Sequence, residues 1–210
     1  MKIVGIEKKD SRNVAVLLDN NEKLFLSYET LLKNGLKKDS EISESRFEFL
    51  VRENQKYFIK QKAFTYLSRR RHSEHEIGIK LKQRGYNADL INIVLGELKE
   101  NNYIDDKQFA LQFLEEMSSR KKWSPKKIKA ELIKKGVSNI IISEVIDERY
   151  SRNSEIENVL AIANKKLRIL KSKTDDAGEI RQKLFSFLYQ RGFEYDLVNE
   201  IISSVLEKEK

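Results

Sequence analysis

Apolar positions change their spacing once along the chain. Up to about residue 27, short β-prone runs alternate with polar turns, at residues 2–6, 14–18 and 24–26. The segment Asp19-Asn20-Asn21 separates the last two runs, and Asn and Asp tolerate the positive φ of tight turns. This pattern predicts a three-stranded meander with a hairpin around Asn20-Asn21. A sheet so small is marginal alone, so we expect it to pack on helices.

From about Ser43 onward the spacing becomes helical. Apolar residues recur every three or four positions, at Phe47, Leu50, Val51, Phe58, Phe64 and Leu67. This period indicates an amphipathic stretch that forms one long helix or two. No convincing strand follows it, so the rest of the chain is expected to be helical.

A longer period lies on top of the helical one, and three glycines mark it: Gly85, Gly136 and Gly192. Apolar residues stand eight and four positions before each glycine, and one, five, six, nine and ten positions after it. Agreement at all these offsets in three copies is improbable by chance and predicts an internal repeat. Each glycine is expected to end a helix in the left-handed conformation that a Cβ disfavours.

Helix-start signals agree with this repeat. Capping residues precede the expected helices, at Ser73 with Glu76, Ser124-Pro125, Thr174 with Asp175 and Asp176, Asn87, and Ser138. The fold class expected is mainly α: three tandem three-helix repeats in an elongated, curved array behind a small N-terminal β-meander. The expected boundaries are a β-rich subdomain at 1–42, a linker helix at 43–56, and repeats at 57–100, 101–150 and 151–210.

Composition narrows the classes of protein. Among 210 residues there are 41 Lys and Arg against 33 Asp and Glu, a formal charge of +8, and no Cys. The missing Cys excludes disulfide scaffolds, thiol catalysis and Cys-based metal sites. No apolar run approaches the roughly 18 residues of a membrane span, and the start lacks a signal-peptide core. We therefore expect a cytoplasmic protein with no membrane association and an acidic partner, either nucleic acid or a protein surface.

Basic clusters recur where the first and second helix of each repeat join. They are Arg69-Arg70-Arg71, then Arg120-Lys121-Lys122 extending to Lys126 and Lys127, then Lys171 and Lys173 behind Lys165, Lys166 and Arg168. Cations at a helix C-terminus also complement the helix dipole, so any one cluster has a purely structural explanation. Recurrence in phase favours a surface that meets a negative partner. Tyr66 and Trp123 flank two clusters and could stack on bases, but core packing is the better interpretation for Trp123.

Catalytic patterns are weak. Asp105 and Asp106 could bind a metal, but one of them capping the next helix is the simpler interpretation. A zinc site at His72 and His75 would need further ligands that the chain does not obviously supply. There is no phosphate-loop glycine pattern, serine nucleophile elbow or His-Glu-x-x-His. We expect no enzyme activity, cofactor or metal.

Three motifs together resemble the RecX family of regulatory proteins. They are Tyr66-Leu67-Ser68-Arg69-Arg70-Arg71-His72-Ser73-Glu74-His75-Glu76-Ile77 continuing to Lys80-Leu81-Lys82-Gln83-Arg84-Gly85-Tyr86; Tyr103-Ile104-Asp105-Asp106 with Phe109-Ala110; and Ser124-Pro125-Lys126-Lys127-Ile128-Lys129-Ala130-Glu131-Leu132 with Gly136-Val137. The resemblance covers about residues 57–210, and the β-rich head resembles an extension found in some members. Ser124 stands where the family more often has Gly, and either residue serves as an N-cap.

The resemblance implies a monomeric modulator of the RecA recombinase. Such proteins bind in the groove of the RecA filament on single-stranded DNA, limit its extension and reduce strand exchange. The candidate contact residues, for RecA and for DNA phosphates, are Arg69, Arg70, Arg71, Arg120, Lys121, Lys122, Lys126 and Lys127. The alternative is a direct DNA- or RNA-binding protein built from helix-turn-helix-like modules. It ranks second because the helices after the glycines carry acidic residues that repel phosphate, at Asp89, Glu97, Glu144 and Asp147.

Overall fold

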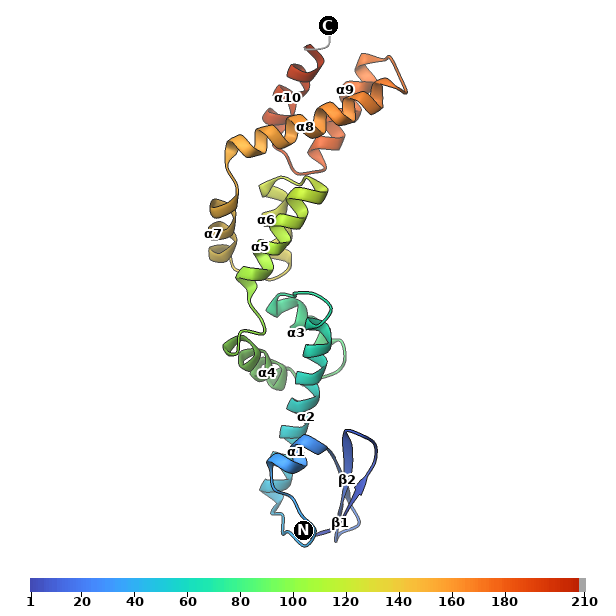
Figure 1. Cartoon of the computed structure of the whole chain (residues 1–210), viewed down its shortest axis with the longest axis vertical. Helices are drawn as coiled ribbons and strands as arrows, with labels where there is room; N and C mark the ends of the chain where they lie inside the picture. The colour runs from blue at the N-terminus through green and yellow to red at the C-terminus, as the bar shows by residue number, and fades with distance from the viewer. Residues whose placement is uncertain (208–210) are drawn as a thin grey trace. The chain divides into compact units, whose positions relative to one another are not determined.

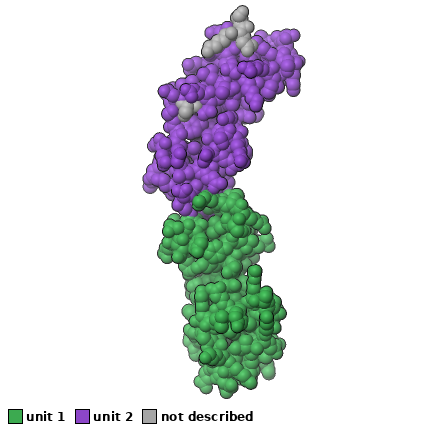
Figure 2. All heavy atoms as spheres, viewed as in Figure 1, with its two compact units in different colours: residues 1–72, 77–104 green, residues 73–76, 105–210 purple. Residues whose placement is uncertain are grey.

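The computed structural model describes residues 1–207, with Ser154 described by its backbone alone. It divides into two compact units, which Figure 2 colours separately. Unit 1 contains residues 1–72 and 77–104, and unit 2 contains residues 73–76 and 105–210. None of the described helices is both long enough and apolar enough to cross a membrane.

The N-terminal residues of unit 1 form the expected antiparallel meander. Strands β1 (Ile3–Lys8), β2 (Asn13–Leu18) and β3 (Lys23–Ser27) pair in the order β1-β2-β3. Asn21 has a φ of 65° in the predicted hairpin. The buried side chains Ile3, Val16 and Leu26 form one core with Leu50 of the following long helix. Packing on this helix gives the small sheet the support that it needs.

Two helices follow the sheet. The short helix α1 (Tyr28–Lys33) was not predicted; Ser27 caps it by accepting a hydrogen bond from the Thr30 N–H at 3.0 Å. Helix α2 (Glu44–Leu67) begins at its cap Ser43 and runs without interruption, which decides between the one helix and two that the sequence left open. Because α2 also supplies Ile59 and Ala63 to the next core, one helix serves both the sheet and the first repeat.

Each repeat contains three helices around its own core. Figure 1 labels these helices along the chain. The first repeat combines the second half of α2 with α3 (Glu74–Lys82) and α4 (Ala88–Glu100). The second contains α5 (Asp106–Glu116), a π-helical turn η1 (Met117–Lys121), α6 (Pro125–Lys134) and α7 (Asn139–Arg149). The third contains α8 (Arg152–Lys171), α9 (Ala177–Tyr189) and α10 (Tyr195–Glu207).

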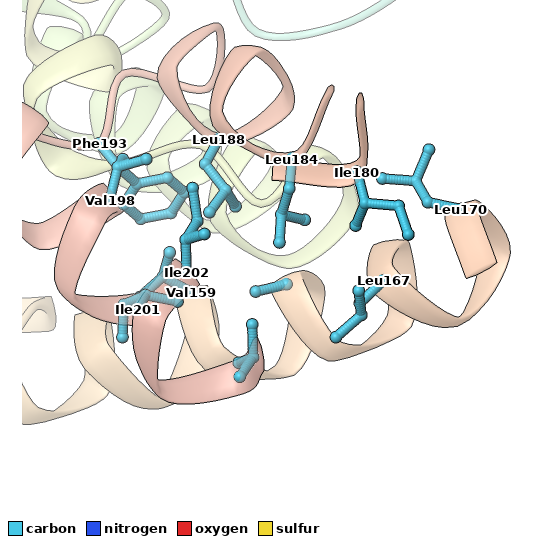
Figure 3. Packing of buried hydrophobic residues seen from close by; sticks show 12 residues of the cluster. Val159, Leu167, Leu170, Ile180, Leu184, Leu188, Phe193, Val198, Ile201 and Ile202 are labelled. Atoms are coloured by element: carbon cyan, nitrogen blue, oxygen red, sulfur yellow. The ribbon is translucent and has the colours of Figure 1, made fainter. Parts of the chain in front are cut away.

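The repeat positions predicted from the glycines are core positions. In the third repeat, Leu184, Leu188 and Phe193 are buried against Val198 and Ile202 of α10 and Val159 of α8. Figure 3 shows these side chains converging between the three helices. The first and second repeats have matching cores around Leu81 and Leu132. The mainly helical fold with three three-helix repeats and a small N-terminal sheet is therefore confirmed.

The helix ends also follow the sequence signals. Gly85, Gly136 and Gly192 have φ values of 81°, 76° and 87°, in the left-handed region. The predicted capping residues accept hydrogen bonds from the first turn of their helices, at Asn87, Asp105, Ser124, Ser138 and Asp176. The glycines end the second helix of each repeat, whereas the caps Ser124 and Asp176 begin it and so mark where the basic joints end.

Candidate partner-binding surface

The joint between the first two helices of the second repeat has an unusual backbone. Helix α5 widens into the π-helical turn η1, and Lys122 then adopts a left-handed conformation with φ 54° and ψ 43°. The N–H of Trp123 donates to the carbonyl of Met117 at 3.1 Å, which closes the turn. Left-handed backbone is uncommon for a residue other than glycine, and π-helical turns are frequent at functional sites. This geometry places Arg120, Lys121 and Lys122 together at the end of the helix.

Trp123 anchors this joint. Its side chain is half-buried and packs against the core of the second repeat. The Nζ atoms of Lys121 and Lys127 lie 4.9 Å and 4.5 Å from the centre of its ring system, within cation–π range. This arrangement supports the interpretation of Trp123 as a packing residue. It also brings Lys121 and Lys127 together from two sides of the joint.

A ring between two cations recurs in the other two repeats, although it lies within α2 in the first and within α9 in the third. In the first repeat, the Nζ atoms of Lys62 and Lys80 lie 5.6 Å and 5.2 Å from the ring centre of Tyr66. In the third repeat, Phe187 holds two cations, namely the ammonium of Lys166 at 5.1 Å and the guanidinium of Arg191 at 3.7 Å. Each repeat therefore holds two cations against one half-buried ring. An aromatic ring positions a cation without neutralising its charge, so the positive potential is preserved.

The cations of the second repeat differ in their partners. Arg120 is 79% exposed and lies 3.6 Å from Glu116. Within residues 1–207, Lys121 and Lys122 have no carboxylate at ion-pair distance from their side chains; Lys121 contacts the Trp123 ring instead. Exposed ion pairs contribute little to stability, so the Arg120–Glu116 pair is readily exchanged for another anion. Arg120, Lys121 and the half-buried Lys122 thus form an available positive surface in this repeat.

Lys126 and Lys127 both contact the third repeat. The Lys126 ammonium lies 2.8 Å from Glu194, and this hydrogen bond raises the pKa of Lys126 and lowers the pKa of Glu194. The Lys127 ammonium donates to the carbonyl of Gln190 at 2.5 Å. Sequence alone grouped these two lysines with the neighbouring cluster. The structure places them at the start of α6, facing the end of α9.

The arginine cluster of the first repeat lies at the C-terminal end of α2 in unit 1. Arg69, Arg70 and Arg71 are all exposed. The Arg69 N–H donates to the Tyr66 carbonyl at 3.1 Å, and an Arg70 guanidinium N–H donates to the Arg71 carbonyl at 2.7 Å. The next residue, His72, is 4% exposed and anchors the loop, with its Nδ1 3.0 Å from the Arg70 carbonyl. A buried anchor beside three exposed guanidinium groups suits contact with an anionic surface.

Sequence reasoning missed contacts between successive repeats within unit 2. The hydroxyl of Ser73 accepts the Glu76 N–H at 3.1 Å, as a capping residue should, and also donates to the Lys135 carbonyl at 2.6 Å. The carboxylate of Glu76 pairs with the Lys135 ammonium at 2.7 Å. The capping-box spacing identified both residues, but nothing in the spacing pointed to Lys135.

Asp105 and Asp106, for which the sequence favours helix capping over metal binding, both accept backbone hydrogen bonds. Asp105 caps α5 by accepting from the N–H groups of Lys107 and Gln108, and Asp106 accepts the Glu74 N–H at 2.9 Å. Among the residues that the structure describes, no cluster of three or more His, Asp or Glu side chains could hold a metal ion.

Family models match all three repeats. The models described as the first, second and third three-helix domains of RecX match residues 60–98, 105–146 and 153–202. Similar proteins include "Regulatory protein RecX" from Clostridium perfringens (strain SM101 / Type A), 31% identical over 208 residues, which are 98% of this chain and 96% of the relative. The protein of the same name from Clostridium botulinum (strain Eklund 17B / Type B) is 28% identical over 97% of this chain and 95% of its own length.

Solved structures share the fold. "Crystal structure of regulatory protein RecX" matches with a TM-score of 0.73 and 22% identity over 95% of this chain and 98% of the other. "Crystal structure of RecX from Lactobacillus salivarius" matches with a TM-score of 0.62 and 24% identity over 73% of this chain and 97% of the other. The glycine-marked repeats, the three matching domain models and near full-length similarity agree: this chain belongs to the RecX family of regulatory proteins.

Proposed function

We propose that this protein modulates the RecA recombinase by binding in the groove of the RecA filament on single-stranded DNA. Binding there limits filament extension and strand exchange. Membership of the RecX family supports the proposal. The proposed action takes place in the cytoplasm. The protein acts as a regulator without chemistry of its own.

One observation carries the proposal: each repeat holds two cations against one half-buried aromatic ring, and in the second repeat this ring, Trp123, lies at the exposed basic joint. Lys121 and Trp123 exemplify it, because the ammonium is held 4.9 Å from the ring centre with no carboxylate at ion-pair distance among the described residues. Positively charged side chains held in place suit recognition of a polyanionic filament, because less side-chain freedom is lost on binding. A ring that holds two cations in every repeat offers several such contacts to a periodic partner.

RecA ATPase on single-stranded DNA provides the test. We expect the protein to lower the steady-state rate, and the triple variant Arg120→Glu, Lys121→Glu, Lys122→Glu to weaken this inhibition at least tenfold in half-maximal concentration. The matched control reverses three exposed lysines of the N-terminal subdomain, Lys23, Lys37 and Lys38. Circular dichroism checks that both variants keep their helices. Full inhibition by the joint variant, or equal loss in the control, would remove these residues from the contact surface.

Direct binding to DNA or RNA is the second candidate function. The acidic residues that weigh against it are partly neutralised: Glu97 lies 3.2 Å from Lys60, and Glu144 lies 3.1 Å from Lys107. Titration with a single-stranded oligonucleotide over a range of salt separates the two candidates. Tight, sequence-selective and steeply salt-dependent binding without RecA favours direct binding. Weak naked-DNA binding together with RecA inhibition favours the proposed function.

A further inference from the structure

Two contacts of the same kind join successive repeats, and each has two sides. One side is the glycine end, which we define as the glycine and the two residues before it: 83–85, 134–136 and 190–192. The other is the helix start, which we define as the capping residue and the next three: 73–76, 124–127 and 176–179. In unit 2, helix start 73–76 covers glycine end 134–136. Ser73 donates to the Lys135 carbonyl at 2.6 Å, and a methyl group on Gly136 would overlap the His75 side chain.

The second contact repeats the first with different side chains. Helix start 124–127 covers glycine end 190–192, and the Ser124 N–H donates to the Arg191 carbonyl at 2.9 Å. A methyl group on Gly192 would lie 2.7 Å from the Ser124 hydroxyl. Ser73 and Ser124 are both fully buried. A glycine end is therefore a surface shaped to receive the start of a helix.

In the first repeat, no described helix start covers the glycine end 83–85. Gly85 has the same left-handed backbone, yet a methyl group there would meet no atom within 4 Å. Arg84 is exposed, and its carbonyl accepts no hydrogen bond from the residues that the structure describes. A cavity of about 420 Å³ opens two residues further on, lined by Asn87 and Leu90 and by Phe47 and Val51 of α2. This end offers a carbonyl acceptor, a cation and partly exposed apolar side chains.

The third repeat has the complementary half, also uncovered. Asp176 caps α9 as Ser73 and Ser124 cap their helices, but it is exposed where they are buried. Glu179 stands three residues after its cap, as Glu76 stands after Ser73, and it pairs within its own helix with Lys183. The chain therefore carries one glycine end and one helix start that no described residue of another repeat covers. Arg84 makes the first positive and Asp176 and Glu179 make the second negative, although Glu48 and Asp89 also line the cavity beside the glycine end.

We propose that copies of this chain associate head to tail, with helix start 176–179 of one copy on glycine end 83–85 of the next. Glu179 of one copy then pairs with Arg84 of the next. Within the chain, the Glu76 carboxylate pairs in the same way with the Lys135 ammonium at 2.7 Å. Asp176 lacks a hydroxyl proton, so its backbone N–H exchanges its 3.3 Å bond to the Thr174 hydroxyl for one to the Arg84 carbonyl, as the Ser124 N–H bonds Arg191. Such a contact is heterologous, because it joins two different surfaces. It does not close into a ring, so it extends into a filament of copies.

The contact is small, so dilute protein stays the monomer that the sequence favours, and association requires high concentration. Binding side by side along a polymer supplies such a concentration. The proposal thus goes beyond RecA binding, and its test needs no RecA. Sedimentation equilibrium of the full chain should give an average mass that rises above 24.7 kDa as the concentration increases.

Charge reversal makes the test specific. Arg84→Glu places like charges at the contact, and so does Glu179→Arg, so each variant alone should sediment as a monomer. An equimolar mixture of the two variants restores opposite charges at every contact and should recover the association. Misfolding of either variant could not be reversed by mixing. Lys23→Glu, an exposed reversal on β3, should associate like the original chain.

A cross-link gives an independent readout for weak association. The chain has no cysteine, so single cysteines can be introduced as Gln83→Cys in one copy and Asp175→Cys in another. Mild oxidation of the mixture should give a disulfide-linked dimer faster than a mixture of Lys23→Cys with Asp175→Cys. A monomer at every concentration with no preferential cross-link overturns the proposal, and so does association that both charge reversals leave unchanged.

Discussion

A methyl group on Gly192 would lie 2.5 Å from the Cβ of Lys127, closer than two non-bonded carbon atoms approach. The glycine thus has two roles: it accommodates the left-handed helix end, and it lets the next helix start approach. Gly85 has the first role alone, because nothing described in the structure covers it. This difference between equivalent glycines can be measured.

Gly192→Ala should destabilise the protein more than Gly85→Ala. A left-handed alanine costs about 1–2 kcal/mol at either position. At Gly192 the added methyl also overpacks the contact with Lys127, which costs about a further 1–3 kcal/mol. Urea denaturation followed by circular dichroism measures both losses. Equal losses in the free energy of unfolding at the two positions would mean that the contact between repeats accommodates the added methyl group without an energetic cost.

Ser73→Ala should cost about 1–2 kcal/mol in the free energy of unfolding, from the lost cap and the lost bond to Lys135. The hydroxyl is fully buried and bonds both the Glu76 N–H and the Lys135 carbonyl. Ser186→Ala, at an exposed position on α9, is the control and should change stability by less than about 0.5 kcal/mol. A Ser73 variant as stable as this control would contradict the assigned bonds.

Asn54→Leu should loosen the N-terminal sheet. The Asn54 side chain accepts the Ser27 N–H at 2.7 Å and donates to the Phe25 carbonyl at 2.8 Å, so it ties α2 to β3. Leucine leaves both backbone groups without these partners, at a cost of about 1–3 kcal/mol for each buried group. Hydrogen exchange at the Ser27 amide should speed up in the variant. Asn164→Leu, at an exposed position on α8, should leave that amide unchanged.

Glu194 and Glu155 should have pKa values that are shifted in opposite directions from the ordinary carboxyl value. The hydrogen bond from Lys126 lowers the pKa of Glu194, whereas burial, and then the charge of Glu194, raises the pKa of Glu155. The stabilising Lys126–Glu194 contact is thus fully present above the ordinary range and is lost as pH falls through the lowered pKa. Glu155 acts in the opposite sense, since its raised pKa makes the folded state less stable as pH rises through the carboxyl range.

Carboxyl NMR titration checks these directions. Lys126→Met should raise the pKa of Glu194 towards its ordinary value. Glu194→Gln should lower the pKa of Glu155 but leave it above the ordinary value, because burial is the larger cause. If Glu155 reached its ordinary value in the Glu194→Gln variant, repulsion rather than burial would be the main cause.

The repeats could be predicted because their signals are local. A glycine that ends a helix, and a Ser, Asn or Asp that starts the next, act within one turn of backbone, and sequence spacing records such contacts directly. The buried offsets around Gly85, Gly136 and Gly192 followed from the helical period alone. The N-terminal meander followed from three short β-prone runs and from the turn residues around Asn20-Asn21.

Other features depend on residues far apart in sequence. Helix α1 has six residues, too few for a helical period to show, and Leu31 is buried through the tertiary core of the sheet. Charge spacing could not separate Lys126 and Lys127 from Lys121, because Glu194 and the Gln190 carbonyl lie more than 60 residues away. The π-helical turn 117–121 was not predicted either, because no apolar or capping spacing in the sequence marks it.

The contact between Ser73 and Lys135 spans 62 residues, which sets an order for folding during synthesis. When the ribosome has released the start of α3, the carbonyl that receives the Ser73 hydroxyl has not yet been translated. The same holds for Ser124 and Arg191 one repeat later. Each newly emerged repeat therefore supplies the carbonyl that binds the capping serine of the repeat before it. These contacts form in order from the N-terminus as the chain is synthesised.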